Sequence, residues 1–389
     1  MESAAASSST NNELPVVLVT GASGYVALHC VRRLLESPYR VRGTVRSLRN
    51  KQKVDPLWRL PGATERLELV EADLLKEEGW DKAVADCSFI LHVASPWVIV
   101  ADESVVETAL TGTLTVLRAA ARCPSVRKVV LTSSCAAVND GHKNKSRVFD
   151  ETCWTNLQSK KVEHYGRSKA LAERAAWDFW NALDHSTRFQ LTVLNPTLVF
   201  GPVLSDVDHG CAQILARIMD WKTSLAQPKA SLGLVDVRDV ADAHVVALER
   251  PQTDGERILI TATPSAWYVD IARWLKAEFA QFGYSITTLE ATNPLLRLYA
   301  ASGIDPQARQ VVNRIGGELR FDNSKSIRLL NMQYRPIDAA VVDMAHSMID
   351  FGMVRATKKY RARFDANINN GTNARQPRRS AVVSPYGKR

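Results

Sequence analysis

Residues 16–27 read Val-Val-Leu-Val-Thr-Gly-Ala-Ser-Gly-Tyr-Val-Ala and carry the most informative pattern in the chain. The apolar run from Val16 to Thr20 is typical of a strand buried on both faces. Gly21 permits a sharp turn out of that strand, and Gly24 leaves room for a phosphate group to approach the backbone. A helix expected over 25–36 offers free N–H groups at its first turn, where an anion is favoured. The stretch therefore predicts a dinucleotide site in the first β-α unit of a parallel sheet.

Short apolar runs alternate with amphipathic segments through the first half of the chain. After the first unit we expect strands at 40–46, 67–70, 89–94, 128–132 and 191–194, with helices at 80–85, 103–122 and 162–183. The rhythm breaks after Pro196 and resumes with a helix at 240–249, a strand at 257–261 and helices at 269–282 and 339–351. The pattern predicts an α/β fold: a Rossmann-type doubly wound parallel sheet with a smaller, interleaved C-terminal substrate lobe.

The same pattern divides the chain into segments with different roles. Residues 14–195 are predicted to form the dinucleotide-binding domain, with returns to it near 232–262, and residues 196–231 and 263–355 the substrate lobe. Residues 1–13 are rich in Ala, Ser and Asn without a basic or apolar segment, so we interpret them as a flexible lead and not a secretory signal. Residues 356–389 hold nine basic residues and one acidic residue, and we predict a disordered basic tail there.

Composition excludes several classes of protein. A chain of 389 residues with 46% hydrophobic and 23% charged content is typical of a folded globular protein. The most apolar run, 89–101, is too short and too polar to span a bilayer. The net charge of +9 lies almost wholly in the tail, so we expect no specific nucleic acid partner, and we favour a passive tail over a weak electrostatic tether. Six cysteines without a C-x-x-C pair predict reduced thiols and a cytoplasmic location, and the dispersed histidines predict no metal site.

The end of the second predicted strand bears on the choice between the two nicotinamide dinucleotides. An acidic residue there would bind the ribose hydroxyls of NAD. The sequence instead has Arg46, Arg49, Lys51 and Lys53, whose cationic groups suit the 2′-phosphate of NADP(H). We therefore predict NADP(H), with solvated surface charges as the alternative interpretation.

A second informative site begins the long helix predicted at 162–183. Tyr165 and Lys169 are four residues apart and so share one face of that helix, and theirs is the only Tyr-x-x-x-Lys pair in the chain. The predicted fifth strand ends in Thr132-Ser133-Ser134, at the sheet edge where α/β proteins bind ligands. A carbonyl that accepts hydride needs a hydrogen-bond donor and a proton. Tyr165 can deliver that proton if Lys169 stabilises its phenolate, while Ser134 holds the substrate oxygen.

These segments together resemble the extended short-chain dehydrogenase/reductases, in the branch of dihydroflavonol 4-reductases, cinnamoyl-CoA reductases and yeast-type aldehyde or methylglyoxal reductases. The resemblance runs from about Val16 to Val354. It rests on TGASGYVA (20–27), YRVRGTVRS (39–47), LVEADL (69–74), LHVASP (91–96), VVLTSSCAAVN (129–139), FDETCW (149–154), YGRSKALAERAAW (165–177), LNPTLVFGP (194–202) and LVDVRDVADAHVVALE (234–249).

The resemblance implies a role for each matching residue. It gives Ser134, Tyr165 and Lys169 as the catalytic triad, and Asn139 as a further substrate contact beside Ser134 and Tyr165. The implied cofactor contacts are Gly21, Ser23, Gly24, Tyr25, Val26, Arg46, Lys53, Asp73, Leu74, Val93, Ala94, Ser95, Tyr165, Lys169, Pro196, Leu198 and Val199. Ala27 stands where the usual glycine fingerprint has its third glycine, as in some aldehyde-reductase relatives. The stretch from Asn293 to Leu319 looks longer than in the plant flavonoid enzymes, so a flavonoid substrate is not implied.

The interpretation is thus an NADPH-dependent carbonyl reductase acting on a small-molecule aldehyde or ketone, as a monomer or homodimer. Within the same superfamily, a hydroxysteroid dehydrogenase and an NAD-dependent sugar-nucleotide epimerase or dehydratase remain alternatives. A protein that binds NADP only to sense it is the alternative outside enzymes.

Overall fold

The computed structural model describes residues 14–95, 103–142, 147–207, 209–303, 311–312 and 315–362. The chain divides into two compact units. The first comprises the described residues of Met1–Val199, Leu232–Ser265 and Gly317–Arg335, and the second those of Phe200–Ser231, Ala266–Gly316 and Pro336–Arg389. The predicted lead at 1–13 and the part of the predicted tail beyond residue 362 lie outside the described residues.

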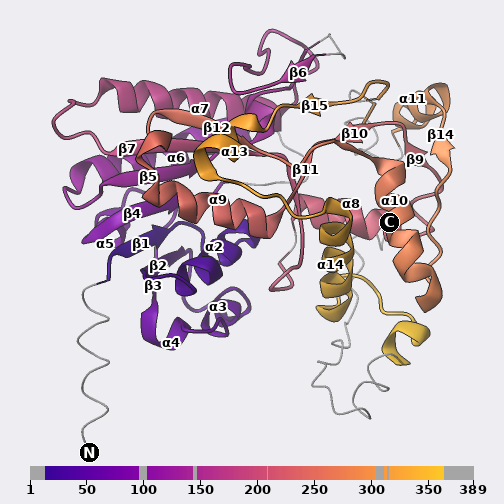
Figure 1. Ribbon diagram of the computed structural model, residues 1–389, viewed down its shortest axis with the longest axis horizontal. Coiled ribbons are helices and arrows are strands. Elements are labelled where there is room, and N and C mark those ends of the chain that lie inside the picture. Colours follow the sequence, from indigo (N-terminus) through magenta and orange to yellow (C-terminus); the bar gives the residue numbers. More distant parts are fainter. Residues whose placement is uncertain are drawn as a thin grey trace, which may run out of the picture. The chain divides into compact units, whose positions relative to one another are not determined.

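A seven-stranded parallel sheet forms the centre of the first unit (Figure 1). Its strand order is β12-β7-β5-β4-β1-β2-β3, so the chain builds outward from β1 in one direction and then from β4 in the other. The predicted Rossmann-type parallel sheet is confirmed. This order creates a switch point between β1 and β4, where such sheets bind ligands beyond the strand ends. The strands are β1 (Val16–Val19), β2 (Arg40–Val45), β3 (Leu67–Glu71), β4 (Cys87–His92), β5 (Lys128–Thr132), β7 (Gln190–Pro196) and β12 (Glu256–Ile260).

Two helix pairs flank this sheet: α6 packs along α7, and α2 packs along α9 (Figure 1). Under α6 and α7 the sheet buries a continuous apolar cluster that includes Leu18, Ile90, Val129 and Leu191, each with no exposed surface. The helices of this unit are α2 (Tyr25–Leu35), α3 (Lys51–Trp58), α4 (Ala63–Arg66), α5 (Trp80–Val84), α6 (Ser104–Arg122), α7 (His164–Ala182), α9 (Val237–Glu249) and α13 (Ser324–Leu330), with 3₁₀ turns η1 (Cys135–Ala137) and η2 (Pro251–Thr253).

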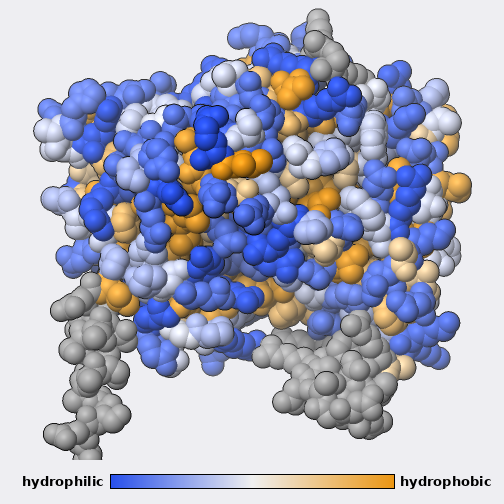
Figure 2. All heavy atoms as spheres, in the orientation of Figure 1, coloured by the Kyte–Doolittle hydropathy of each residue, from blue (hydrophilic) through white to orange (hydrophobic). Residues whose placement is uncertain are grey.

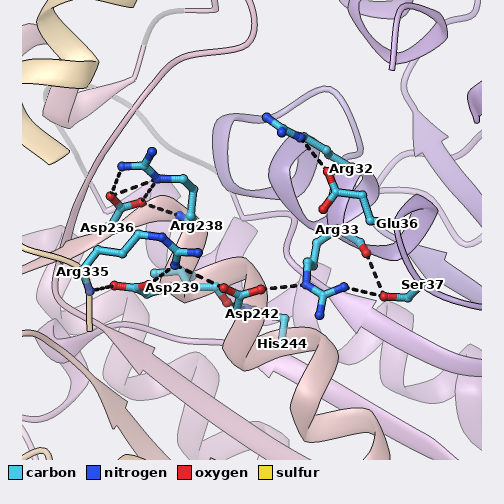
Figure 3. Close-up of polar contacts among 11 residues, drawn as sticks. Arg32, Arg33, Glu36, Ser37, Asp236, Arg238, Asp239, Asp242, His244 and Arg335 are labelled. Atoms are coloured by element: carbon cyan, nitrogen blue, oxygen red, sulfur yellow. Dashed lines mark hydrogen bonds and ion pairs between the residues drawn. The ribbon is translucent and has the colours of Figure 1, made fainter. Parts of the chain in front are cut away.

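A line of charged side chains ties α9 to α2 and to Arg335 (Figure 3). Arg335 pairs with Asp239, and it also lies 3.2 Å from Asp242 Oδ2. The other oxygen of Asp242 accepts a hydrogen bond from Arg33 Nε at 2.7 Å. Burial raises the pKa of Asp239, and Arg335 opposes that rise. These pairs fix α9 against its neighbours through contacts whose arginines remain partly exposed.

Helix α9 begins three residues before the predicted start at Val240. The side chain of Asp236 accepts a hydrogen bond from Arg238 N at 2.7 Å and thereby caps the first turn. Helix α3 was not predicted at all. It starts at Lys51, where the Asn50 side chain accepts from Lys53 N, so Lys53 lies in a helical first turn and not in a loop.

The second unit is built around three helices, α8 (Gly210–Met219), α10 (Tyr268–Phe279) and α14 (Ile337–Asp350), which pack against one another. Strands β9 (Gln227–Pro228) and β14 (Glu290–Ala291) pair in parallel beside them. The remaining elements along the chain are β6 (Val148–Phe149), β8 (Leu198–Phe200), β10 (Ser231–Leu232), β11 (Leu234–Asp236), β13 (Ala266–Trp267), η3 (Ala280–Phe282), α11 (Asn293–Ala301) and β15 (Arg320–Phe321).

Packing in this unit continues past Arg355, the last residue of the predicted substrate lobe. Tyr360 is 1% exposed, and its hydroxyl lies 2.8 Å from His346 Nδ1. The ring of Tyr360 also stacks on Phe279 of α10. The prediction that disorder begins at residue 356 is therefore wrong for residues 356–362.

Hydrophilic residues predominate on the face drawn in Figure 2, and hydrophobic ones are interspersed in small groups. Within the described ranges, no helix combines the length and the apolar character needed to cross a bilayer.

Candidate active site

The glycine turn after β1 contacts the end of β4. Gly21 has φ +61°, a backbone conformation that other residues rarely adopt, and a Cβ added to it would lie 2.9 Å from the Cβ of Ala94. A larger residue at this position would therefore strain the backbone and also clash with Ala94. Thr20 Oγ1 accepts a hydrogen bond from Ala94 N at 2.9 Å and lies 2.9 Å from His92 Nδ1. These contacts hold the two strand ends together at the switch point.

Helix α2 begins directly after this turn, with Gly24 as its N-cap. No side chain caps the helix, and its first turn holds no acidic residue. Its N-terminal amides and positive dipole end therefore face no carboxylate of their own helix, which suits an anion such as a pyrophosphate. Ser23, Tyr25 and Val26 lie in or beside this turn, as predicted from the sequence.

The basic residues after β2 form the next part of the site. Arg46 and Arg49 are exposed, and the guanidinium of Arg46 makes no hydrogen bond or ion pair with any residue that the structure describes. Lys51 begins α3, and Lys53 follows within its first turn. Glu71, at the end of β3, accepts a hydrogen bond from Leu48 N at 2.7 Å, which fixes the loop that carries these cations.

The residues assigned to the adenine side follow β3 and β4. Asp73 Oδ1 accepts from Leu75 N at 3.1 Å, and the Asp73 carbonyl accepts from Trp80 Nε1 at 2.9 Å. Leu74 packs closely on Gly112 of α6: a Cβ added to Gly112 would lie 3.1 Å from the Cβ of Leu74. Val93, Ala94 and Ser95 continue the chain beyond β4 and are all partly buried.

A cleft lies where β4, β5, α6 and α7 meet. It brings together three of the predicted site residues, Ala94, Ser95 and Lys169, but its lining does not include Ser134 or Tyr165. The residues that line it are Ala94, Ser95, Ala109, Thr113, Leu131, Thr132, Ser133, Lys169, Ala172 and Glu173.

Lys169 is the charged group best placed in this cleft. Its Nζ donates to Ser95 Oγ at 3.0 Å and lies 5.9 Å from the centre of the Tyr165 ring. Burial lowers the pKa of its ammonium to about 8, an effect that the Glu173 carboxylate opposes. His92 is also fully buried and its pKa falls to about 3, so its ring is neutral near pH 7.

Ser134 and Tyr165 lie on two elements that pack together. Ser134 precedes η1, and its Oγ accepts from Ala136 N at 3.1 Å. Tyr165 is the second residue of α7, which packs against η1. A Cβ on Gly166 would lie 2.3 Å from Asp140 Oδ2, so this glycine allows the start of α7 to approach the loop that follows η1.

Asn139 lies in that same loop. Its Oδ1 is inaccessible to solvent and accepts no hydrogen bond from any described residue. A buried acceptor without a donor is costly unless a ligand or water supplies one. This orphan oxygen fits the predicted contact of Asn139 with the substrate.

Pro196, Leu198 and Val199 lie at the end of β7 and the start of β8. Leu198 N donates to Gly233 O at 3.1 Å, and the intervening Thr197 N donates to Ile260 O at 3.1 Å. The backbone of this segment is therefore fixed from two directions.

Sequence reasoning missed a buried polar group behind the cleft. Glu173 accepts hydrogen bonds from Ser133 Oγ at 2.5 Å, from Asn195 Nδ2 at 2.7 Å and from Arg257 Nε at 2.7 Å. Two signals could have found it: Glu173 lies four residues after Lys169 on the same helix face, and Arg257 is a charged residue inside an apolar strand.

A second contact that the sequence did not predict joins the end of β5 to α9. Thr132 Oγ1 lies 2.6 Å from His244 Nε2, and His244 Nδ1 lies 2.7 Å from the carbonyl of Val240. Because that carbonyl can only accept, the proton sits on Nδ1 and the Thr132 hydroxyl donates to Nε2. Burial lowers the pKa of His244 to about 4, which keeps this ring neutral.

Comparison with known proteins identifies the family. The sequence model of the NAD dependent epimerase/dehydratase family matches residues 17–261, more than half of the chain. The chain belongs to this family. The predicted resemblance to extended short-chain dehydrogenase/reductases is confirmed.

Several relatives within the epimerase/dehydratase family are reductases. Cinnamoyl-CoA reductase CAD2 of Medicago truncatula is 39% identical over 275 residues, which cover 69% of this chain and 82% of the relative. NADPH-dependent methylglyoxal reductase GRE2 of Saccharomyces cerevisiae is 31% identical over 357 residues, or 86% of this chain and 98% of the relative. The crystal structure of yeast methylglyoxal/isovaleraldehyde reductase Gre2 complexed with NADPH matches with a TM-score of 0.70 and 28% identity, over 87% of this chain and 99% of that chain.

Within the part of the chain that the structure describes, no three His, Cys, Asp or Glu side chains are grouped so that they could hold a metal ion. All six cysteines lie in the described residues, and none of them forms a disulfide.

Proposed function

We propose that this protein is an NADPH-dependent reductase of small-molecule aldehydes or ketones. The observation that carries the proposal is the buried Lys169 ammonium, which lies in a cleft at the carboxyl ends of the strands, beside Ser95 and Ser133 and near the Tyr165 ring. The relatives named above support the reaction class, because their names describe reductases and one of their structures holds NADPH.

The chain's own residues fit the cofactor. Gly21, Ser23, Gly24 and the uncapped first turn of α2 would hold the pyrophosphate. Arg46, whose guanidinium has no partner among the described residues, and the first turn of α3 with Lys53 would hold the 2′-phosphate. Asp73, Leu74 and the backbone of 93–95 would contact the adenosine and ribose. When bound, NADPH supplies the hydride that the carbonyl carbon accepts.

Four side chains would act on the substrate and on the proton that it receives. Tyr165 Oη would donate its proton to the carbonyl oxygen as negative charge develops there. Ser134 Oγ would hold the same oxygen by a hydrogen bond, with its own lone pair already engaged by Ala136 N. The Lys169 ammonium would stabilise the tyrosinate that remains, and Asn139 Oδ1 would accept a hydrogen bond from the substrate.

The cation after β2 separates this function from the first alternative in the family. An epimerase or dehydratase that keeps NAD bound would gain from an acidic residue at the end of β2, and Arg46 stands there. The assignment of residues 196–231 and 263–355 to substrate recognition stays a prediction, as does the monomeric or dimeric state.

The experiment that tests the proposal measures NADPH oxidation with a panel of aldehydes and ketones. We expect the wild type to consume NADPH with at least one of them, and Tyr165→Phe to lower kcat by at least about 100-fold while binding NADPH normally. Tyr39→Phe is the matched control. Tyr39 directly precedes β2, at the opposite end of the strands from the cleft, and its hydroxyl donates a hydrogen bond to Glu249. Equal turnover in the two variants would reject Tyr165 as the acid.

A second substitution tests the cofactor. Arg46→Asp replaces the expected partner of the 2′-phosphate by a partner for ribose hydroxyls, so the preference for NADPH over NADH should fall by at least about tenfold. Arg59→Asp, at an exposed position of the same segment, should leave the preference unchanged. An unaltered preference in Arg46→Asp would contradict the assignment.

A further inference from the structure

The buried carboxylate of Glu173 joins one helix to three strands. It is 1% exposed and lies on α7, one turn beyond Lys169. Its three hydrogen-bond donors come from the end of β5 (Ser133), from β7 (Asn195) and from β12 (Arg257). No other contact of α7 described above reaches so many strands at one point.

Asn195 extends this connection to the proposed triad. Besides its bond to Glu173, Asn195 Nδ2 donates to the main-chain carbonyl of Ser134 at 3.2 Å. Ser134 is thereby held on both sides: its carbonyl by Asn195, and the preceding residue Ser133 by Glu173 itself. The same carboxylate thus restrains the helix of Tyr165 and Lys169 and the turn of Ser134.

Arg257 is a rigid partner for this carboxylate. Its Nη1 donates to the carbonyls of Glu151 at 2.9 Å and Cys153 at 2.7 Å. Its guanidinium carbon lies 3.6 Å from the centre of the Trp154 ring, a distance that allows a cation–π contact. The two carbonyls, the Trp154 ring and the Glu173 carboxylate all contact the guanidinium of Arg257. Its ion pair with Glu173, at 2.7 Å, therefore has little freedom to move.

Stability alone does not explain such a group. Burying an ion pair costs desolvation energy that the attraction between the charges scarcely offsets, so apolar side chains of similar volume stabilise a fold equally well. Glu173 also lines the cleft together with Lys169, and a carboxylate at this position favours the charged form of the lysine.

We propose that Glu173 is a positioning residue of the reductase site, which orients Ser134 and α7 through Ser133 and Asn195 and stabilises the Lys169 ammonium. This inference rests on the proposed function. The charged and titratable groups that bear on Lys169 are His92 from β4, Tyr165 and Glu173 from α7 and, behind Glu173, Arg257 from β12.

The test is the dependence of kcat on pH in Glu173→Gln. The amide keeps the shape of the side chain but loses the charge and places an N–H₂ group among donors. We expect kcat at its optimum to fall about tenfold and the KM for NADPH to stay within about threefold. In this proposal the loss of the Lys169 proton sets the alkaline limb of the profile. A neutral Gln at position 173 favours the Lys169 ammonium less than a carboxylate does, so the alkaline limb should move to lower pH by about one unit.

Arg257→Gln supplies a change of opposite sign. It removes the cation that offsets Glu173, so Lys169 experiences more negative charge and the alkaline limb should move to higher pH. This variant also decides the matter if Glu173→Gln does not fold: a limb that stays in place or moves down overturns the inference.

Asp236→Asn is the matched control. Asp236 is a fully buried carboxylate paired with Arg238 on α9, and it keeps its capping oxygen as an amide. We expect this variant to lower the melting temperature without moving the alkaline limb.

A folded Glu173→Gln enzyme whose alkaline limb lies at the wild-type pH would overturn the inference. If Tyr165→Phe is inactive in the same assays, the proposed function stands regardless of that result, and if Tyr165→Phe is fully active, the proposed function itself fails.

Discussion

A buried lysine ammonium lies near each end of strand β5, Lys128 on the strand itself and Lys169 on α7, and the two differ in what surrounds them. At the first residue of the strand, Lys128 Nζ donates to the carbonyl of Arg250 at 2.9 Å and to Thr253 Oγ1 at 2.8 Å. Beyond the last residue, Lys169 Nζ donates to Ser95 Oγ at 3.0 Å inside the cleft. Burial lowers the pKa of both lysines to about 8.

A lowered lysine pKa therefore does not by itself mark a functional site. Lys128 neutralises the carbonyl end of α9, which ends at Glu249, and its partners belong to the turn that follows that helix. Lys169 instead lines the cleft, near a neutral histidine and a carboxylate that is held from three strands. The cleft and the orphan acceptor of Asn139 distinguish the second end from the first.

The largest expected effect comes from removing each ammonium in turn. Lys169→Met should lower kcat by about 1000-fold, because the positive charge beside Tyr165 that would stabilise the tyrosinate is lost. Lys128→Met should leave kcat within about twofold of the wild type and change only the stability. Initial rates at saturating NADPH, with folding checked by circular dichroism, measure both. Similar losses in the two variants would erase the distinction between the ends of β5.

A pair of glycines extends the comparison to the turn that follows β1 and to the start of α4. Gly21 and Gly62 both have positive φ, so alanine strains the backbone at each by about 1 kcal/mol. Only at Gly21 does the new Cβ meet another backbone segment of the proposed cofactor site. We expect Gly21→Ala to raise the Kd for NADPH at least about tenfold and Gly62→Ala to leave it unchanged, as measured by fluorescence titration. Equal affinities would place the pyrophosphate elsewhere.

The sequence predicted the sheet and most helices because their signals are local. The run at 16–20, the glycines after it and the spacing of Tyr165 and Lys169 each lie within a few residues of one another. Glu173 and Arg257 are separated by 84 positions, and their pairing depends on the strand order β12-β7-β5, which no local pattern encodes. The early start of α9 was missed because it depends on a capping bond of Asp236, although an Asp before an apolar helix is itself a signal.

The last prediction concerns stability against pH, and it tests the Lys128 end alone. Between about pH 8 and 10.5 this lysine is largely neutral in the folded chain and still protonated in the unfolded chain. Because the unfolded state then binds more protons, the contribution of Lys128 to the free energy of unfolding rises with pH over this range. The stability of the wild type relative to Lys128→Met should grow by about 2 kcal/mol from pH 7.5 to pH 10.5.

Denaturant unfolding at a series of pH values measures this difference, and Lys169 cancels because both proteins retain it. A difference that stays flat, or that shrinks as the pH rises, would mean that the Lys128 ammonium is not destabilised by its burial.

The most direct test of the central claim follows the hydride itself. NADPH deuterated at either face of C4 of its nicotinamide is supplied with an aldehyde that the enzyme reduces, and the alcohol is analysed by mass spectrometry. We predict that one of the two labelled cofactors transfers deuterium to the carbinol carbon and the other does not. An alcohol free of deuterium from both, or no NADPH consumption with any aldehyde or ketone, would contradict the assignment of this cleft as a carbonyl reductase site.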